Sequence, residues 1–185
     1  MESPSFNVLL LCGTDASAER RQSDHFIAHF NRLGLSVKKW YLGLSSPPQY
    51  TLTAKEGERH VGDVRDPWPN AWGWPERFDL IIDEFCPRED TTGRPTFSLG
   101  YLDRVGRRLK EEGHFAFAGH EHVGTYMEIK ETRDTRSSGK ATRWIYVRAS
   151  NVPAFFAKAL YMEYRGKVSY DGGQHYMYVF KRRRL

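Results

Sequence analysis

The chain has 185 residues, of which 39% are hydrophobic and 14% aromatic, and its formal net charge is +5. This length allows one domain with a full core and is short for two, so we expect a single domain over residues 1–185. The sequence shows no apolar run long enough to cross a membrane, no signal-peptide pattern in residues 1–11 and too few cysteines for a disulfide framework, which predicts a soluble, intracellular and cytoplasmic protein.

The first two thirds of the chain alternate strands with helices. Residues 6–12 form a continuous apolar run, typical of a strand buried on both faces, and residues 17–33 show helical spacing up to Gly34. Further elements are predicted as strands at residues 35–42, 59–64 and 78–85, a helix at 97–112 that stops at Gly113, and a strand at 114–119. This order predicts a Rossmann-like α/β fold with a mostly parallel sheet and helices on both faces.

After residue 119 the pattern changes to hairpins. Residues 126–130 and 142–148 are strand-like and flank a polar tip, which predicts a hairpin. Residues 151–161 are predicted as a helix, and the last two strands, residues 162–170 and 175–181, as a C-terminal antiparallel hairpin.

A loop rich in tryptophan and proline precedes the strand at residues 78–85. Three prolines between Pro67 and Pro75 exclude a long regular helix there. The loop carries Trp68, Trp72 and Trp74, which can stack on a base or fold over a sheet face that lacks a helix. We favour the second role.

The element order resembles the class I S-adenosylmethionine-dependent methyltransferase fold, in which a parallel βα sheet ends in an antiparallel hairpin strand. The resemblance spans residues 6–182. It is supported by GDVRD at residues 62–66, by FDLIID at residues 78–83, and by the passage from helix through glycine to strand at residues 97–118.

The resemblance implies methyl transfer from S-adenosylmethionine to a nucleic acid or a small molecule. It also implies roles for single residues: Gly13, Thr14, Asp63 and Val64 at the cofactor, and Asp83 and Glu84 near the acceptor. We add His120, just past the strand predicted at residues 114–119, as a further candidate near the acceptor.

Two positions depart from the family pattern. Residues 12–17 hold one glycine where the family has several, and Lys38 to Tyr41, taken as the end of the second strand, contain no carboxylate for the ribose.

An alternative is therefore a catalytically inactive scaffold that binds nucleic acid or a protein partner. A third possibility is a nucleoside-processing hydrolase or transferase that binds an anion at the Gly13 turn. The dinucleotide fingerprint is absent, which argues against NAD and FAD.

The candidate catalytic residues follow predicted strands. In a doubly wound sheet, ligands bind beyond the carboxyl ends of the strands, where Asp83 and Glu84 stand. One of these acids could orient an acceptor or take its proton, or could simply bond to a neighbouring helix. His120 and His122 could act as a base or bind a metal with one of the acids, but a polar loop is the default and we predict no metal site.

Two further groups have both a functional and a structural interpretation. Cys12 and Cys86 are expected at the same edge of neighbouring strands, where buried thiols are a simpler interpretation than a redox pair. Basic residues gather late in the chain and could hold nucleic-acid phosphates or form a solvated face: Arg133, Arg136, Lys140, Arg143, and Arg182 to Arg184.

Overall fold

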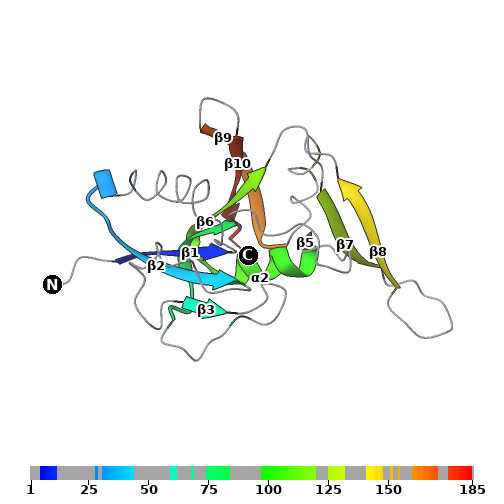
Figure 1. Cartoon of the computed structure of the whole chain (residues 1–185), viewed down its shortest axis with the longest axis horizontal. Coiled ribbons are helices and arrows are strands. Elements are labelled where there is room, and N and C mark those ends of the chain that lie inside the picture. The colour runs from blue at the N-terminus through cyan, green and yellow to red at the C-terminus, as the bar shows by residue number, and fades with distance from the viewer. Residues whose placement is uncertain are drawn as a thin grey trace.

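The computed structural model describes residues 5–11, 28, 31–43, 59–61, 68, 74–83, 97–119, 125–131, 141–147, 151, 154, 160–170 and 175–184. Its elements are β1 (Ser5–Leu11), β2 (Ser36–Gly43), β3 (Arg59–Val61), β4 (Phe78–Asp83), β5 (Phe97–Ser98), α2 (Leu99–Arg108), β6 (Leu109–Gly119), β7 (Thr125–Glu131), β8 (Ala141–Val147), β9 (Met162–Tyr170) and β10 (His175–Arg182) (Figure 1). No helix in these ranges is long and apolar enough to cross a membrane.

Seven strands form one sheet in the order β3-β2-β1-β4-β6-β10-β9. The chain runs outward from β1 to β3 and then crosses to β4 on the other side of β1, so the direction of winding reverses between β1 and β4. Strands β1, β2, β3, β4 and β6 are parallel, whereas β10 is antiparallel to both of its neighbours. The predicted Rossmann-like α/β fold with a C-terminal hairpin is confirmed.

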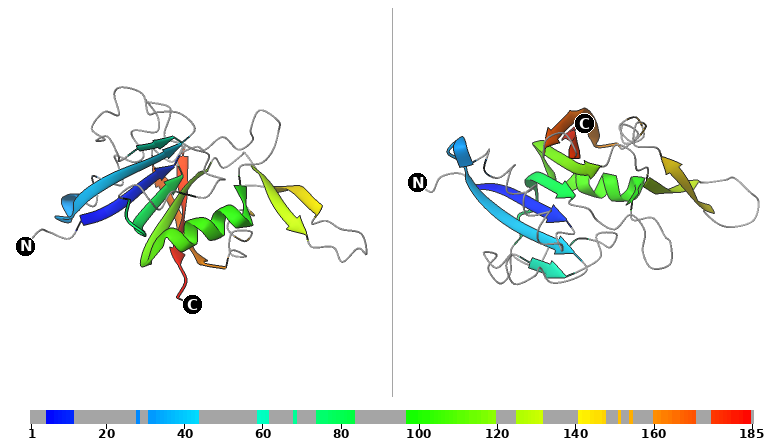
Figure 2. Two further views of the ribbon diagram at one scale, coloured as in Figure 1. Left: turned by 90° about the horizontal axis from the view of Figure 1, so that it is seen from below. Right: turned by 45° about the horizontal axis from the view of Figure 1, so that its top comes forward.

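Both faces of the sheet are buried, as the unbroken apolar run in β1 predicts. Leu9 and Leu11 belong to a core cluster on the face covered by α2, and Val8 and Leu10 belong to a second cluster on the opposite face. The helix contributes an apolar stripe to the first cluster, formed by Tyr101, Leu102 and Val105. Figure 2 shows α2 lying along the sheet, beside β6.

The end of the first predicted helix and the hairpin after residue 119 are confirmed as far as the structure describes them. Ala28, Asn31 and Arg32 are helical, and Gly34, with a φ of 76°, donates its N–H to the Asn31 carbonyl at 3.0 Å, which ends the helix where the sequence predicts. The hairpin of β7 and β8 forms, but it pairs with β5 in a separate sheet of three strands. Most of the helices predicted at residues 17–33 and 151–161 lies outside the described residues.

The helix prediction for residues 97–112 is wrong at both ends. Residues 97 and 98 form β5, α2 ends at Arg108, and β6 begins at Leu109. Phe78 pairs with Leu109 and Leu80 with His114, so residues 110–113 form a bulge opposite Asp79. A Cβ on Gly113 would lie 3.0 Å from the Phe78 carbonyl oxygen, which makes this glycine a close-packing residue rather than a helix stop.

Trp68 and Trp74 are both buried in the core cluster beneath α2. The Trp74 ring lies 5.8 Å from the Trp40 ring of β2 and 6.1 Å, edge on, from the Phe78 ring of β4. Both residues therefore pack in the core against the sheet, as the favoured role expects, although α2 contributes to the same cluster. Trp72 lies outside the described residues.

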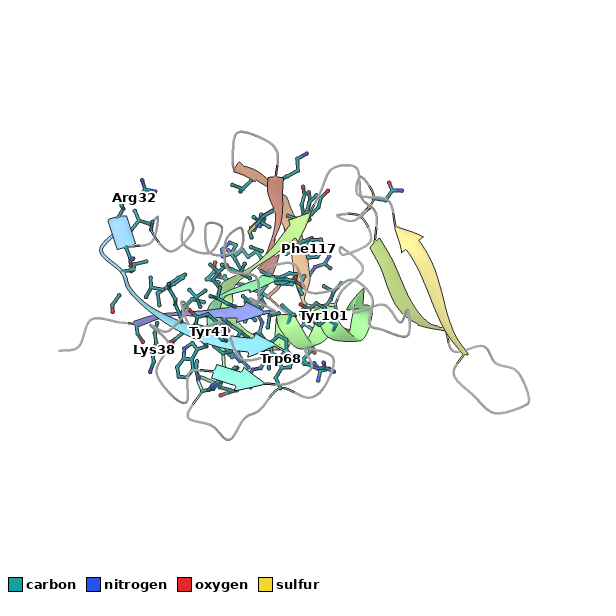
Figure 3. The ribbon with its side chains drawn as sticks, in the orientation of Figure 1. Arg32, Lys38, Tyr41, Trp68, Tyr101 and Phe117 are labelled. Atoms are coloured by element: carbon teal, nitrogen blue, oxygen red, sulfur yellow. The ribbon has the colours of Figure 1, made fainter. Side chains whose placement is uncertain are left out.

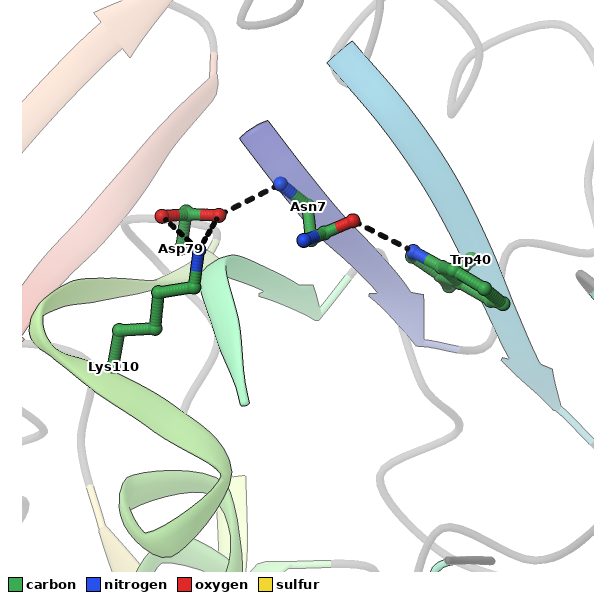
Figure 4. Close-up of polar contacts among 4 residues, drawn as sticks. All are labelled: Asn7, Trp40, Asp79 and Lys110. Atoms are coloured by element: carbon green, nitrogen blue, oxygen red, sulfur yellow. Dashed lines mark hydrogen bonds and ion pairs between the residues drawn. The ribbon is translucent and has the colours of Figure 1, made fainter. Parts of the chain in front are cut away.

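A polar network ties four strands together near the amino ends of the parallel strands (Figure 4). Pairing of β1 with β4 begins at Val8, and the N–H of Asn7 instead donates to the Asp79 carboxylate at 2.7 Å. Lys110 of β6 donates to both oxygens of that carboxylate at 2.8 and 2.9 Å, and Trp40 Nε1 donates to Asn7 Oδ1 at 3.3 Å. The bulge in β6 therefore delivers Lys110 to Asp79.

Candidate functional site at the carboxyl ends of β1 and β4

A row of registered residues marks the carboxyl edge of the sheet at the point where the winding reverses. Strand pairing aligns, in order across the sheet, Leu42, Leu11, Asp83, Phe117 and Tyr178. All five side chains are buried, and the Phe117 and Tyr178 rings stack at 6.2 Å. Asp83 thus places a carboxylate in a row of apolar and aromatic neighbours.

The Asp83 side chain is completely buried, and its Oδ2 accepts a hydrogen bond of 2.9 Å from the Tyr101 hydroxyl. Tyr101 is the third residue of α2, and Figure 3 shows it near the end of the sheet toward which β1 points. Burying a carboxylate costs several kcal/mol unless donors replace its water. The hydrogen bond therefore stabilises the carboxylate and ties the first turn of α2 to the end of β4.

This geometry bears on the two interpretations of Asp83. The carboxylate bonds to a side chain of the neighbouring helix, as the structural interpretation expects, and it does so at the sheet edge where the functional interpretation places a site. Its catalytic role stays a prediction. Glu84 and His120, the other predicted catalytic residues, lie outside the described residues, as does His122.

The predicted cofactor residues Gly13, Thr14, Asp63 and Val64 also lie outside the described residues. In the sequence they follow closely on the described strands, because β1 ends at Leu11 and β3 ends at Val61. Cys12 and Cys86 are outside the described part as well. Among the residues that the structure does describe, no cluster of potential metal ligands occurs.

The second strand has the predicted length but ends one residue later than predicted, at Gly43 instead of Leu42. Lys38 to Tyr41 are internal residues of β2, which continues to Gly43 and pairs with β3 over its last three positions. Leu42 and Gly43 therefore occupy the end of this strand. The position at which the resemblance places a ribose-binding acid still has no carboxylate.

The C-terminal arginines contact their own chain. The Arg182 guanidinium donates to the Leu109 carbonyl, Arg183 Nε donates to the Met162 carbonyl at 2.6 Å, and Arg184 pairs with Glu112 at 2.6 Å. Arg133, Arg136 and Lys140 lie outside the described residues, and Arg143 lies in β8, of which only the backbone is described. Nucleic-acid binding by these residues stays a prediction.

Tyr101 is the site residue that the sequence interpretation missed. It falls beside Leu102 and one turn before Val105, so it lies on the buried stripe of α2. The hydroxyl of a tyrosine on such a buried stripe needs a hydrogen-bond partner, and this requirement could have marked Tyr101 as a candidate site residue. Which partner it finds depends on the packing of α2 across the end of β4, which the sequence pattern does not specify.

No protein-family model matches the chain, and no curated protein matches it either. Solved structures do match. One is a 1,6-didemethyltoxoflavin-N1-methyltransferase from Burkholderia thailandensis with bound 1,6-didemethyltoxoflavin and S-adenosylhomocysteine, at 18% identity and a TM-score of 0.54, covering 95% of this chain and 70% of the other. Another is the N-methyltransferase NodS from Bradyrhizobium japonicum with S-adenosylhomocysteine, at 13% identity and a TM-score of 0.53, covering 96% and 78%.

A third similar structure is CalS10 from Micromonospora echinaspora, an amino pentose methyltransferase with bound S-adenosylmethionine, at 15% identity and a TM-score of 0.52, covering 96% of this chain and 84% of the other. At these identities the likeness concerns the fold. The chain has the Rossmann-like fold of the class I S-adenosylmethionine-dependent methyltransferases.

Proposed function

We propose that this protein is an S-adenosylmethionine-dependent methyltransferase acting on a small-molecule acceptor. The observation that carries the proposal is the buried Asp83 at the reversal point between β1 and β4, in a sheet with the methyltransferase fold. Ligands of doubly wound sheets bind at this edge. The three similar structures described above contain S-adenosylmethionine or S-adenosylhomocysteine.

The chain's residues would divide into two groups around the cofactor. Gly13 and Thr14 would lie against its amino-acid end, and Asp63 and Val64 near its adenine. The end of β2 fits the cofactor less well, because Leu42 and Gly43 offer no carboxylate to the ribose hydroxyls. We therefore expect weaker cofactor binding than in a methyltransferase that has this acid.

The second group would act on the acceptor. When bound, S-adenosylmethionine supplies an electrophilic methyl group, and the protein must orient a nucleophilic nitrogen or oxygen and accept its proton. Glu84 and His120 are proposed for proton transfer. Asp83 is proposed to position the end of β4, because its carboxylate is buried and bonded to Tyr101.

Two observations favour a small-molecule acceptor over a nucleic acid. The similar proteins from Burkholderia thailandensis and Micromonospora echinaspora are named for 1,6-didemethyltoxoflavin and for an amino pentose. In addition, Arg182, Arg183 and Arg184 donate hydrogen bonds within their own chain, so binding phosphates with them would compete with these contacts.

Calorimetric titration with S-adenosylhomocysteine and S-adenosylmethionine tests cofactor binding. We expect a dissociation constant below about 1 mM for both compounds and no comparable binding of adenosine alone. Asp63→Ala should weaken binding. Asp79→Asn is the control variant. It also removes a carboxylate, but at the amino end of β4, away from the edge where the cofactor is expected. Millimolar or absent binding of both compounds to the wild-type protein would rule out the proposed methyltransferase function.

Variants separate the proposed catalytic roles once an acceptor supports turnover. Glu84→Gln or His120→Gln should lower kcat by about 10²-fold or more with little change in cofactor affinity, if the residue transfers a proton. Asp83→Asn keeps an acceptor for the Tyr101 hydroxyl, whereas Tyr101→Phe removes the hydrogen bond. A positioning role predicts that Tyr101→Phe lowers kcat more than Asp83→Asn does, and the reverse order would assign Asp83 a direct role.

A catalytically inactive scaffold that binds nucleic acid is the second candidate, favoured by the single glycine in residues 12–17 and by the missing acid at the end of β2. Fluorescence anisotropy with a labelled RNA at several salt concentrations tests it. Phosphate contacts predict an affinity that falls steeply with salt. A flat salt dependence, or no binding, would remove this candidate.

A further inference from the structure

A cavity opens on the face of the sheet that α2 does not cover. It has a volume of about 490 Å³, within the range of small-molecule sites, which is about 300–1,000 Å³. Its apolar wall is formed by Phe6, Leu80, Ala116, Val168 and Val179, which come from β1, β4, β6, β9 and β10. Five strands therefore contribute to one concave apolar surface.

Polar groups gather at one side of this cavity, on β4 and the bulge of β6. They are Asp79, Lys110, Glu112 and His114. Lys110 pairs with Asp79 at 2.8 Å (Figure 4), and Glu112 pairs with Lys181 and with Arg184. Each charged residue among the described residues of the lining therefore already has a counter-ion within the protein. An ionic ligand would find no uncompensated partner among these described residues.

His114 differs from the other polar residues of the lining. It is half-buried, and its pKa is lowered chiefly by burial and also by the nearby charges of Lys181 and Arg165, against the opposing influence of Glu112. The neutral form is therefore favoured near pH 7, and a neutral imidazole has one nitrogen that accepts a hydrogen bond. The cavity thus combines an apolar wall with a neutral hydrogen-bonding group.

We propose that this cavity is a binding site for a small, uncharged, ring-containing molecule with a single hydroxyl or N–H donor. The ring lies against the wall formed by Leu80, Ala116 and Val179, and the donor faces His114. An ionised carboxylate or ammonium group would lose its water in this apolar space without finding an uncompensated charge among the described lining residues. The site therefore selects neutral molecules.

The cavity is separate from the proposed methyl-transfer site. Asp79 in its lining lies four residues before Asp83 on β4, which corresponds to about 13 Å along the strand. Leu80 and Ala116 also belong to the core cluster on the opposite face of the sheet from α2. The inference therefore does not depend on methyltransferase activity, and saturating S-adenosylhomocysteine is not expected to displace a ligand from the cavity.

Two probes with the same ring system test the selectivity. We expect 2-naphthol to bind the full-length protein and naphthalene-2-carboxylate to bind at least about tenfold more weakly, as measured by calorimetry at pH 7.5. The methyl signal of Ala116 in NMR spectra should shift with 2-naphthol. Absence of binding, an unmoved Ala116 signal, or tighter binding of the carboxylate would each overturn the proposal.

A substitution in the wall tests the location. Val168 is 42% exposed, so Val168→Lys should fold, and it places a charge at the cavity. It should weaken 2-naphthol binding at least about tenfold, whereas Leu33→Lys, the same change at an exposed leucine outside the lining, should not. Equal effects of the two variants would overturn the assignment. So would a dimer, seen by sedimentation, that dissociates in Val168→Lys, because this face would then be an interface between copies.

Discussion

At the residue scale, Glu112 shows how the C-terminal end of the chain is held to the sheet. Its carboxylate accepts hydrogen bonds from Lys181 and Arg184, which lower its pKa from 4.5 to about 2. The group is exposed to solvent, so salt screens these interactions. Because the folded-state pKa is depressed, the contribution to stability is present above the unfolded pKa and is lost as the pH falls toward 2.

We therefore expect Glu112→Gln to lower the free energy of unfolding at pH 7, with a difference from wild type that shrinks below about pH 4.5 and disappears near pH 2. Urea unfolding at a series of pH values measures this difference, which should also shrink in 1 M NaCl. Glu111→Gln is the matched control, with the same charge change at the exposed neighbouring residue. A Glu112→Gln effect that did not vary with pH would contradict the proposed linkage.

At the scale of elements, α2 is positioned by close packing as well as by its apolar stripe. Gly106 is buried, and a Cβ at this position would lie 2.4 Å from the Cβ of Tyr161, just before β9. A side chain here would push the helix away from the segment that leads into the C-terminal hairpin. Gly100, in the first turn of the same helix, is exposed.

These two glycines should respond in opposite directions to the same substitution. Gly106→Ala should lower the free energy of unfolding by about 1–3 kcal/mol, because overpacking outweighs the better helix propensity of alanine. Gly100→Ala should leave stability unchanged or raise it by up to about 1 kcal/mol. Urea unfolding of both variants measures the effects. Stabilisation by Gly106→Ala would show that α2 and Tyr161 can separate at little cost.

At the scale of the whole molecule, one sheet of seven strands joins the two core clusters. β1, β2, β4, β6 and β10 place side chains in both clusters, so neither can form without the strands of the other. The hairpin of β7 and β8 stands apart from this sheet, beyond α2 (Figures 1 and 2). It is linked to the rest through the pairing of β7 with β5, which directly precedes α2.

If the chain forms a single domain over residues 1–185, as the sequence predicts, it should unfold in one cooperative transition. Far-UV circular dichroism and tryptophan fluorescence should give coincident denaturation curves. Trp144 lies in β8, and the other four tryptophans lie between residues 40 and 74. Trp144→Phe therefore removes only the fluorescence of the three-stranded sheet of β5, β7 and β8, called the small sheet below. A fluorescence transition that moves away from the circular dichroism curve in this variant would indicate that the small sheet unfolds independently.

The amino-acid sequence by itself determined the order and type of the strands of the large sheet, apart from the start of β6, because apolar runs and glycine or proline breaks are local signals. It did not predict β5. The leucine run of β1, the six residues of β4 and the final hairpin all lie where these signals place them. The edge at which ligands are expected follows from the same information, because the carboxyl ends of parallel strands share one edge. The sequence therefore also predicted the position of Asp83 at that edge.

Only the tertiary structure decided which groups meet across elements. At the bulge in β6, Lys110 reaches Asp79 and Gly113 packs on β4, and helical periodicity across residues 97–112 does not reveal either contact. The hydrogen bond from Tyr101 to Asp83 and the cavity beside His114 likewise depend on strand register and helix docking. Such contacts join residues distant in the chain, and their energies depend on burial, which local sequence patterns do not encode.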